Sequence, residues 1–239
     1  PEEALREKAI EPPEPRQTRT CDAAVVGAGT AGALAALAAG YENADTVVVE
    51  PLSFPGGIGT GGNIPSYYWG VTGGLQEEVD VRLREVMPLF AKRDVWARGF
   101  HPDAKAAVLE MLMMESGAEI WYGSMLADVD VEDGWVRGAL IATPTGPVRI
   151  EAAGWVDCTG DGDLAAWAGA SFQFGRDRDH VLHAYTQSCG RLGLHEERIR
   201  HQGLNYDAGF VDPTDSQDMT RGRIEAIHQH LKPRYDQLD

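Results

Sequence analysis

The sequence predicts an α/β fold: a parallel β-sheet covered by helices, with an inserted antiparallel sheet and the start of a further region. Two apolar runs, residues 21–27 and 46–50, flank an alanine-rich stretch at 28–40. A strand, a helix and a strand in this order form a βαβ unit of about 30 residues, whose two strands lie parallel. Short alternating segments separated by turn residues follow at 118–160 and favour antiparallel strands.

The first elements can be placed in order along the chain. Residues 1–20 are polar and rich in proline, so we expect an extended arm without a core of its own. The run 21–27 lacks alternation, which is typical of a strand buried on both faces. The stretch 28–40 contains strong helix formers and ends at Gly40, and 46–50 is a second buried strand.

Two helices and a series of strands are expected next. Apolar residues near helical spacing predict an amphipathic helix over 75–92. A second helix over 101–117 has Pro102 in its first turn and Gly117 as its C-terminal cap. The strands are expected at 118–123, 125–134, 135–146, 147–154 and 155–160.

The pattern weakens after Ala170. Residues 172–193 suggest strand and loop, and residues 220–239 suggest a helix that breaks at Pro233. We therefore divide the chain into the extended arm and two larger parts. The expected boundaries are 1–20 for the arm, 21–175 for the main domain and 176–239 for a partial substrate or interaction region.

Composition excludes several classes of function. The formal net charge of −16 repels phosphate backbones, so we expect no nucleic-acid partner. Apolar runs fall far short of the ~20 residues that cross a bilayer, so we expect no membrane span. The 3 cysteines form no CxxC pair and indicate free thiols in a reducing compartment. We expect a cytoplasmic protein, with a cleaved export signal as the open alternative because the first residue is Pro1.

A glycine motif stands at the first junction between strand and helix. Gly27, Gly29 and Gly32 form G-x-G-x-x-G, the pattern of a Rossmann-like dinucleotide site in its required context. Gly27 allows the tight turn, Gly29 lets the backbone approach a pyrophosphate, and Gly32 lets the helix pack on the strand. The start of the helix, with Thr30 and Ala31, offers N–H groups to an anion. A glycine-tolerant turn without a ligand is the competing interpretation.

Glu50 ends the second strand at the distance from the glycine motif where a ribose-binding carboxylate is expected. Such a carboxylate accepts a hydrogen bond from the ribose 2′-OH and disfavours a 2′-phosphate. Glu50 therefore predicts a nucleotide without that phosphate.

The glycine-rich stretch after Glu50 distinguishes between dinucleotides. The sequence here resembles the large family of FAD-dependent oxidoreductases with the glutathione-reductase-type FAD-binding fold, in which a Gly-Gly stretch and a Thr or Ser follow the ribose acid. The resemblance implies FAD as the cofactor and places Gly57, Thr60 and Gly62 beside the flavin. A nicotinamide-only dehydrogenase would leave this loop unexplained. The further candidate cofactor-binding residues of this stretch are Pro51, Gly56, Gly59 and Gly61.

The segment 155–170 resembles the second FAD segment of the same family, a strand that ends in Ala-Thr-Gly-x-Gly. It is most similar to members whose motif reads Thr-Gly-Asp-Gly-Asp before an alanine-rich helix, although Cys158 replaces the usual alanine. The resemblance also implies that the backbone of Leu126 contacts adenine. The candidate cofactor-binding residues of this segment are Thr159, Gly160 and Asp161.

Two other interpretations of this segment stay open. A calcium loop that starts at Asp157 would need a bidentate Glu at its twelfth position, where Ala168 stands. A solvated turn would need no ligand at all. Calcium is the weaker interpretation, and we expect no metal site.

His101, His183 and Tyr68 are the candidate catalytic residues. His101 follows the amphipathic helix, and a capping or surface role is its alternative. His183 forms an i, i+3 pair with His180 on the side where family members build the substrate site, and a surface or packing role is the alternative. Tyr68 follows the glycine-rich loop and is placed to wall the flavin or a substrate, with core packing as its alternative.

The predicted function is that of an FAD-dependent oxidoreductase, an enzyme that transfers a hydride or electrons to or from a small organic substrate. The alternatives are a flavin-dependent monooxygenase or halogenase and a non-catalytic nucleotide-binding subunit. The resemblance covers about residues 20–75 and 100–175, and family members are usually longer. We therefore expect a companion polypeptide that completes the enzyme.

Overall fold

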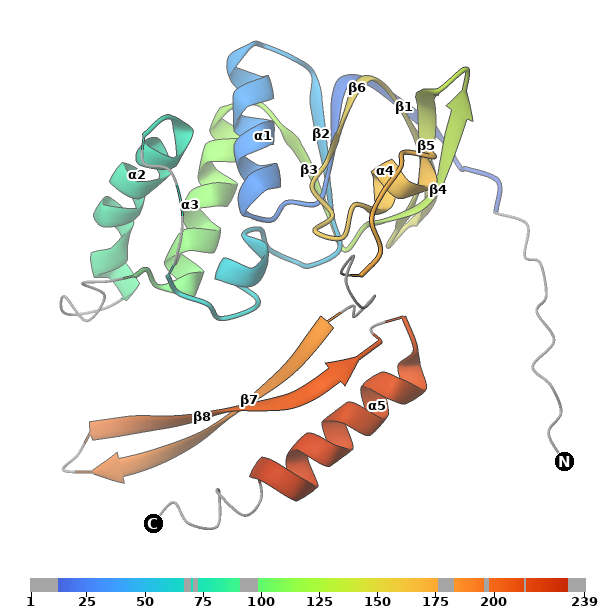
Figure 1. Cartoon of the computed structure of the whole chain (residues 1–239). Coiled ribbons are helices and arrows are strands. Elements are labelled where there is room, and N and C mark those ends of the chain that lie inside the picture. The colour runs from blue at the N-terminus through green and yellow to red at the C-terminus, as the bar shows by residue number, and fades with distance from the viewer. Residues whose placement is uncertain are drawn as a thin grey trace, which may run out of the picture. The chain divides into compact units, whose positions relative to one another are not determined.

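The computed structural model describes residues 13–66, 70, 73–90, 99–175, 183–195, 198–212 and 214–231. The chain divides into two compact units, residues 1–171 and 172–239, and each is described by itself. The described part of the first unit contains a six-stranded sheet and four α-helices (Figure 1). Its elements are β1 (Thr18–Val26), α1 (Thr30–Tyr41), β2 (Thr46–Glu50), the 3₁₀ turn η1 (Gly57–Gly59), α2 (Leu75–Phe90), α3 (Pro102–Glu115), β3 (Glu119–Tyr122), β4 (Met125–Glu132), β5 (Trp135–Thr143), β6 (Gly146–Asp157) and α4 (Asp163–Trp167).

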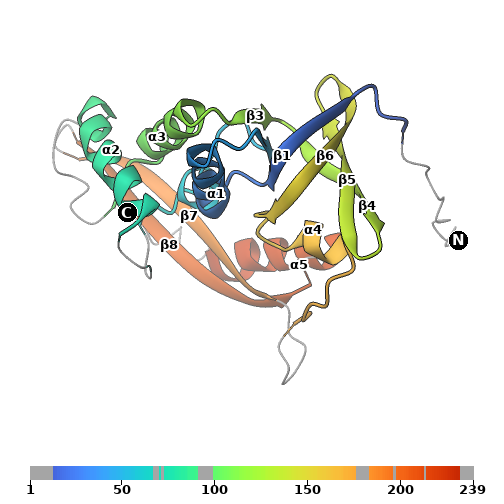
Figure 2. The same cartoon turned by 90° about the horizontal axis from the view of Figure 1, so that it is seen from above.

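The strand order β3-β2-β1-β6-β5-β4 confirms the predicted α/β fold with a mostly parallel sheet. β1 runs parallel to both β2 and β6, and β2 runs parallel to β3. Val26 pairs with Val49 on one side and with Asp157 on the other, so three parallel strands end at one edge of the sheet. The loops that follow these strands therefore gather at the same edge (Figure 2).

The two strands expected at 147–154 and 155–160 are one continuous strand, β6. The prediction of a break at Gly154 was wrong because this residue pairs with Ala23 of β1, and the parallel pairing carries the strand through to Asp157. β6 also pairs antiparallel with β5, and β5 with β4. The antiparallel strands are thus an extension of the main sheet.

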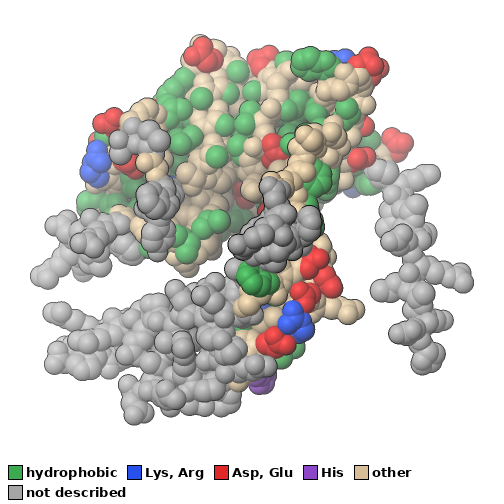
Figure 3. Space-filling view, in the orientation of Figure 1, with side chains coloured by type: hydrophobic (Ala, Val, Ile, Leu, Met, Phe, Trp, Pro, Cys, Tyr) green, Lys and Arg blue, Asp and Glu red, His purple; other side chains and the backbone are tan. Residues whose placement is uncertain are grey.

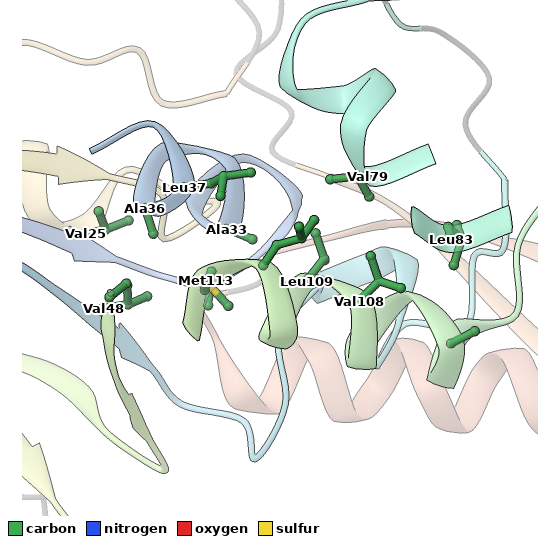
Figure 4. Packing of buried hydrophobic residues seen from close by; sticks show 14 of the residues in the cluster. Val25, Ala33, Ala36, Leu37, Val48, Val79, Leu83, Val108, Leu109 and Met113 are labelled. Atoms are coloured by element: carbon green, nitrogen blue, oxygen red, sulfur yellow. The ribbon is translucent and has the colours of Figure 1, made fainter. Parts of the chain in front are cut away.

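Apolar side chains cover both faces of the sheet. On one face Val25 and Val48 pack beneath α1, and the cluster continues to α3 and α2 through residues such as Met113 and Val79 (Figure 4). On the other face a second cluster surrounds Val47 and includes residues of β5 and β6. Val47 and Val49 belong to one cluster and Val48 belongs to the other. Because both faces of this strand are buried, all three positions are apolar.

Lys105 lies within the first cluster, in the first half of α3. Its side chain is 1% exposed, and its ammonium lies 4.3 Å from the centre of the Phe100 ring. Burial lowers the pKa of Lys105 to about 8, because removal from water disfavours the charged form. At neutral pH the Lys105 side chain is therefore still charged in the folded protein, although burial disfavours the charged form.

We expect Lys105→Met to raise the free energy of unfolding at pH 7 by roughly 1–3 kcal/mol. The pKa of Lys105 is lower in the folded protein than in the unfolded chain, so at a pH between these two values the unfolded chain binds more protons. The wild type therefore gains stability as pH rises from about 8 to about 10.5. Urea titrations across this range measure the effect. A difference between the two proteins that does not shrink over this range would contradict the expectation.

The second unit contains β7 (His183–His195), β8 (Arg198–Val211), α5 (Ser216–Glu225) and the π-helical turn η2 (Ala226–Leu231) in its described part. β7 and β8 pair antiparallel, and α5 packs against β8. The helix expected from residue 220 begins earlier because Asp215 caps it, accepting a hydrogen bond from the Gln217 N–H at 2.8 Å. The predicted break at Pro233 lies outside the described residues.

The surface agrees with the acidic composition. Figure 3 shows more acidic than basic side chains on the drawn face of the described residues. Across the part of the chain that the structure describes, every helix is too short or too polar to cross a bilayer.

Candidate functional site

The first glycine loop, residues 27–32, joins β1 to α1 at the edge where the parallel strands end. Gly27 has a φ of 96°, a backbone conformation that favours glycine, and its N–H donates to the Val49 carbonyl at 2.7 Å. A Cβ on Gly27 would overlap the carbonyl of Cys158, and a Cβ on Gly32 would overlap the carbonyl of Gly27. Both glycines are thus required for close approach of three backbone segments.

Gly29 differs from these two glycines. A Cβ built on Gly29 would meet no atom within 4 Å, so the space beside this residue is open. Gly29 is also the N-cap of α1, and no side chain caps this helix end in the described residues. The positive end of the helix dipole of α1 therefore lies beside this open space.

Glu50 is 4% exposed and bridges the loops on either side of it. One carboxylate oxygen accepts the Ala28 N–H at 2.7 Å, and the other accepts the Leu52 N–H at 2.8 Å. Each oxygen keeps a second lone pair that can accept a ribose hydroxyl. Glu50 therefore combines a structural role, not foreseen from the sequence, with a position suited to the predicted ribose contact.

The loop that follows β2 is joined directly to the first glycine loop. The Gly56 N–H donates to the Ala28 carbonyl at 2.8 Å, and a Cβ on Gly57 would lie 3.2 Å from the Cα of Gly29. The hydroxyl of Thr60 is turned into its own loop, where it donates to the Pro55 carbonyl at 2.7 Å. Its bond to Pro55 holds the turn that brings Gly57 beside Gly29.

The second glycine loop, residues 157–163, lies against the first. The Cys158 N–H donates to the Val26 carbonyl at 2.8 Å, which joins the two loops at their bases. Asp157 accepts hydrogen bonds from the Thr159 hydroxyl at 2.8 Å and from the Ala165 N–H at 2.8 Å. The Thr159 hydroxyl in turn accepts the N–H groups of residues 162 and 163. This network fixes the loop onto the start of α4.

Asp157 gives this network a pH dependence. Burial raises the pKa of Asp157, but hydrogen bonds from the N–H groups of Thr159 and Ala165 and from the Thr159 hydroxyl outweigh burial and hold that pKa below its ordinary value. The carboxylate form therefore stabilises the folded chain above pH ~4, and this contribution is lost as pH falls through the folded pKa.

We expect Asp157→Asn to lower the free energy of unfolding by about 1 kcal/mol at pH 7, because the amide replaces one accepting oxygen. The difference from the wild type should be smaller at pH ~3 than at pH 7, because the wild-type carboxylate loses its stabilising effect as pH falls toward its lowered pKa. Urea titrations at both pH values measure it, with Asp161→Asn as the control on an exposed carboxylate of the same loop. Equal destabilisation by both substitutions would contradict the role of Asp157.

The two glycine loops and the loop after Glu50 line one cleft with a volume of about 660 Å³. Sequence positions more than a hundred residues apart, such as Gly29 and Gly160, thus face the same space. The predicted cofactor-binding residues that line this cleft are Gly27, Gly29, Thr30, Ala31, Glu50, Pro51, Gly57, Leu126, Thr159, Gly160 and Asp161. The predicted residues outside its lining are Gly32, Gly56, Gly59, Thr60, Gly61 and Gly62.

Several lining residues were not found from the sequence. Ser124 just before β4, Met125 at the start of β4 and Trp167 at the end of α4 line the cleft. Their neighbours Leu126 and Asp161 were predicted from motifs, but no motif includes these three positions. The one available signal was that they stand within a few residues of motif positions.

The structure places the candidate catalytic residues as follows. His101 is the N-cap of α3, and its Nδ1 accepts the Asp103 N–H at 3.2 Å, as the alternative interpretation of this residue expected. His183 begins β7, so it does not lie on the helix that an i, i+3 pair with His180 requires. The side chain of His183, and Tyr68 and His180 as a whole, lie outside the described residues.

The calcium interpretation finds no support in the described residues. Among them, no group of three or more His, Cys, Asp and Glu side chains is arranged to hold a metal ion. Both oxygens of Asp157 already accept hydrogen bonds from within the chain. Hydrogen bonds to Asp157 therefore hold this loop.

A sequence profile of the family described as FAD dependent oxidoreductase matches residues 22–236. No protein with a curated description matches the chain in sequence.

Solved structures with a similar fold include a geranylgeranyl bacteriochlorophyll reductase-like protein from Thermoplasma acidophilum. The TM-score is 0.51 at 17% identity, and the match covers 89% of this chain and 62% of that one. The anhydrotetracycline hydroxylase OxyS from Streptomyces rimosus gives a TM-score of 0.51 at 21% identity, with 87% and 49% covered. Such identities show a shared fold alone. The chain spans 62% and 49% of the lengths of these two proteins.

Proposed function

The chain belongs to the family of FAD-dependent oxidoreductases, whose cofactor is FAD, and we propose that it binds FAD in the cleft between its glycine loops and oxidises or reduces a small organic molecule. One observation carries the proposal. The open space beside Gly29 lies at the N-terminus of α1, while the neighbouring Gly27 and Gly32 are closely packed. A diphosphate group has the charge and the size to occupy that space.

The residues of the cleft fit the dinucleotide. None of the described residues that line it is Lys or Arg, so backbone N–H groups and the dipole of α1 would hold the diphosphate. The carboxylate of Glu50 is placed to accept a ribose hydroxyl, since each of its oxygens keeps a free lone pair. The loop after β2 brings Gly57 against Gly29 and would direct the rest of the dinucleotide along that loop.

When bound, FAD supplies hydride or electron transfer, the chemistry that this family performs. The contribution of this chain is to hold and orient the cofactor. The rigid joining of the two glycine loops by the Cys158–Val26 hydrogen bond keeps both halves of the site in register.

Two measurements test the proposal. We expect the chain to retain one FAD after dialysis, seen as the visible absorbance of oxidised flavin. In the native enzyme, purified with any polypeptide that completes it, that absorbance should then disappear when a donor from a panel of reduced nicotinamides, amines and hydroxy acids is added without oxygen. Failure to bind FAD would refute the proposal. Retained FAD that no donor reduces would favour the non-catalytic nucleotide-binding subunit.

The reaction class is a separate question within this proposal. A reductase-like protein and a hydroxylase share the fold at identities too low to indicate the reaction of this chain. Turnover under ¹⁸O₂ distinguishes the possibilities. We propose simple hydride or electron transfer, so the product should contain no ¹⁸O, whereas incorporation of ¹⁸O would identify a monooxygenase.

We also propose that polypeptide outside these 239 residues completes the substrate side of the enzyme. The support is that the chain spans 62% and 49% of the lengths of the two similar structures. The intact mass of the native protein tests it. A single species of 25.9 kDa with stoichiometric flavin and full activity would contradict it.

A further inference from the structure

Among the described residues that line the cleft, every charged side chain is acidic. These residues are Glu50, Asp161 and Asp163, and every described Lys and Arg lies outside the lining. The whole chain also has a formal net charge of −16. A cleft of about 660 Å³ is roughly as wide as the ~10 Å over which salt at 0.1 M screens a charge. A charged group bound in the cleft therefore lies within the electrostatic range of these carboxylates.

Two of these three carboxylates take no part in the hydrogen bonds of the described residues. Glu50 accepts backbone N–H groups at 2.7 and 2.8 Å, so its negative charge is partly compensated. Asp161 and Asp163 are exposed, and within the described part of the chain their carboxylates accept no hydrogen bond. Their full negative charges are therefore directed at whatever the cleft binds.

The pKa of Asp163 reflects the charge of its surroundings. Partial burial raises that pKa above its ordinary value, and the negative charges of Asp161 and Asp157 raise it further. A carboxyl group that is disfavoured in its charged form by neighbouring carboxylates lies in a negative potential, which also repels phosphate oxygens. This part of the lining therefore disfavours each additional negative charge on a ligand.

The second glycine loop brings these carboxylates close to the first. The Cys158 N–H donates to the Val26 carbonyl at 2.8 Å, and a Cβ on Gly27 would overlap the Cys158 carbonyl. The positive end of the α1 dipole attracts a diphosphate that lies against it, and this attraction is similar for any nucleotide with a diphosphate. The repulsion by Asp161 and Asp163 acts through space and grows with the total charge of the ligand.

We propose that Asp161 and Asp163 are specificity-determining residues, which repel adenine nucleotides that end in a free phosphate and so favour FAD. The inference rests on the proposed function, because it requires that FAD binds in this cleft. Both phosphates of FAD lie inside the molecule, whereas the terminal phosphate of ADP carries about one more negative charge. ADP otherwise offers the same adenosine and diphosphate. Selectivity therefore arises from an unfavourable interaction with the competitor, not from an additional attraction to FAD.

Calorimetric titration of the full chain, freed of nucleotide, with FAD and with ADP tests the inference. At pH ~8 and about 0.02 M NaCl the ADP phosphate is fully charged and salt screens little. We expect the double variant Asp161→Asn with Asp163→Asn to bind ADP roughly 10-fold more tightly than the wild type, and FAD only roughly 3-fold more tightly. Both substitutions keep the size of the side chain and remove its charge.

Asp133→Asn is the matched control for charge removal. Asp133 lies in the turn after β4, about 20 Å along that strand from Leu126, the last residue of β4 that lines the cleft. Asparagine is suited to the φ of 51° at this position. This variant should leave both affinities unchanged.

Salt separates charge repulsion from a change in the shape of the cleft. In about 0.5 M NaCl the affinities of the double variant and the wild type should approach each other, because salt screens charges that are not in contact. The single variants, which should each give a smaller gain of the same sign, replace the double variant if circular dichroism shows that it is unfolded.

A gain in ADP affinity no larger than the gain in FAD affinity would overturn the inference, and so would a gain that persists in high salt. In both cases the FAD bound by the wild type would leave the proposed function standing. A wild type that does not bind FAD would overturn both.

Discussion

Replacing Gly29 by valine should abolish FAD binding while the chain stays folded. The backbone of Gly29 is extended, with φ −62° and ψ −169°, a conformation that valine adopts readily. No atom lies within 4 Å of a Cβ at this position, so the side chain finds room in the empty protein. That room is where the diphosphate must lie, and we expect an affinity loss of at least ~100-fold, or about 3 kcal/mol.

Gly154→Val is the matched control for this substitution. Gly154 lies in β6 outside the cleft, and a Cβ there would make only an ordinary contact of 3.7 Å with the Asp22 carbonyl. Absorbance after dialysis with FAD measures retention, and circular dichroism checks the fold of both variants. Stoichiometric flavin in Gly29→Val would contradict the placement of the diphosphate.

Replacing Glu50 by alanine should weaken both the fold and the binding of FAD. The substitution leaves the Ala28 and Leu52 N–H groups buried without their acceptor, and each such group costs about 1–3 kcal/mol. We therefore expect the nucleotide-free protein to lose roughly 2–4 kcal/mol of unfolding free energy. Loss of the charged ribose contact should reduce FAD affinity by about 1.5–3 kcal/mol.

The two effects of Glu50→Ala are measured separately, the first by urea titration without nucleotide and the second by FAD titration below the unfolding transition. Glu132→Ala is the control, because it removes an exposed strand carboxylate whose ion pair with Arg137 lies on the surface. Lower stability with unchanged FAD affinity would mean that Glu50 only supports the loops. Unchanged stability would contradict the buried hydrogen bonds themselves.

The sequence predicted those parts of the fold that depend on local backbone requirements. Glycine is needed at positions 27 and 32 because the neighbouring backbone leaves no room for a Cβ. The glycine motif therefore predicts that backbone segments pack closely at this turn. The run of valines in β2 likewise reports burial on both faces. Such features need no knowledge of distant residues, and the parallel order of β1 and β2 follows from them.

Features set by distant contacts escaped sequence analysis. Gly154 suggests a break in a strand, and only its pairing with Ala23 shows that β6 continues. The resemblance implies that Thr159 binds the cofactor, but it does not reveal that the Thr159 hydroxyl links Asp157 to the start of α4. Trp167 reaches the cleft because α4 packs against β4, a contact between segments about 40 residues apart in sequence that no motif encodes.

A crystal structure of the chain with ADP tests most directly whether the two glycine loops hold one diphosphate. We expect the diphosphate beside Gly29, with its oxygens ~2.7–3.2 Å from backbone N–H groups at the start of α1, and with the second glycine loop closing the other side. A diphosphate bound elsewhere, or one that touches only one of the two loops, would contradict the central claim.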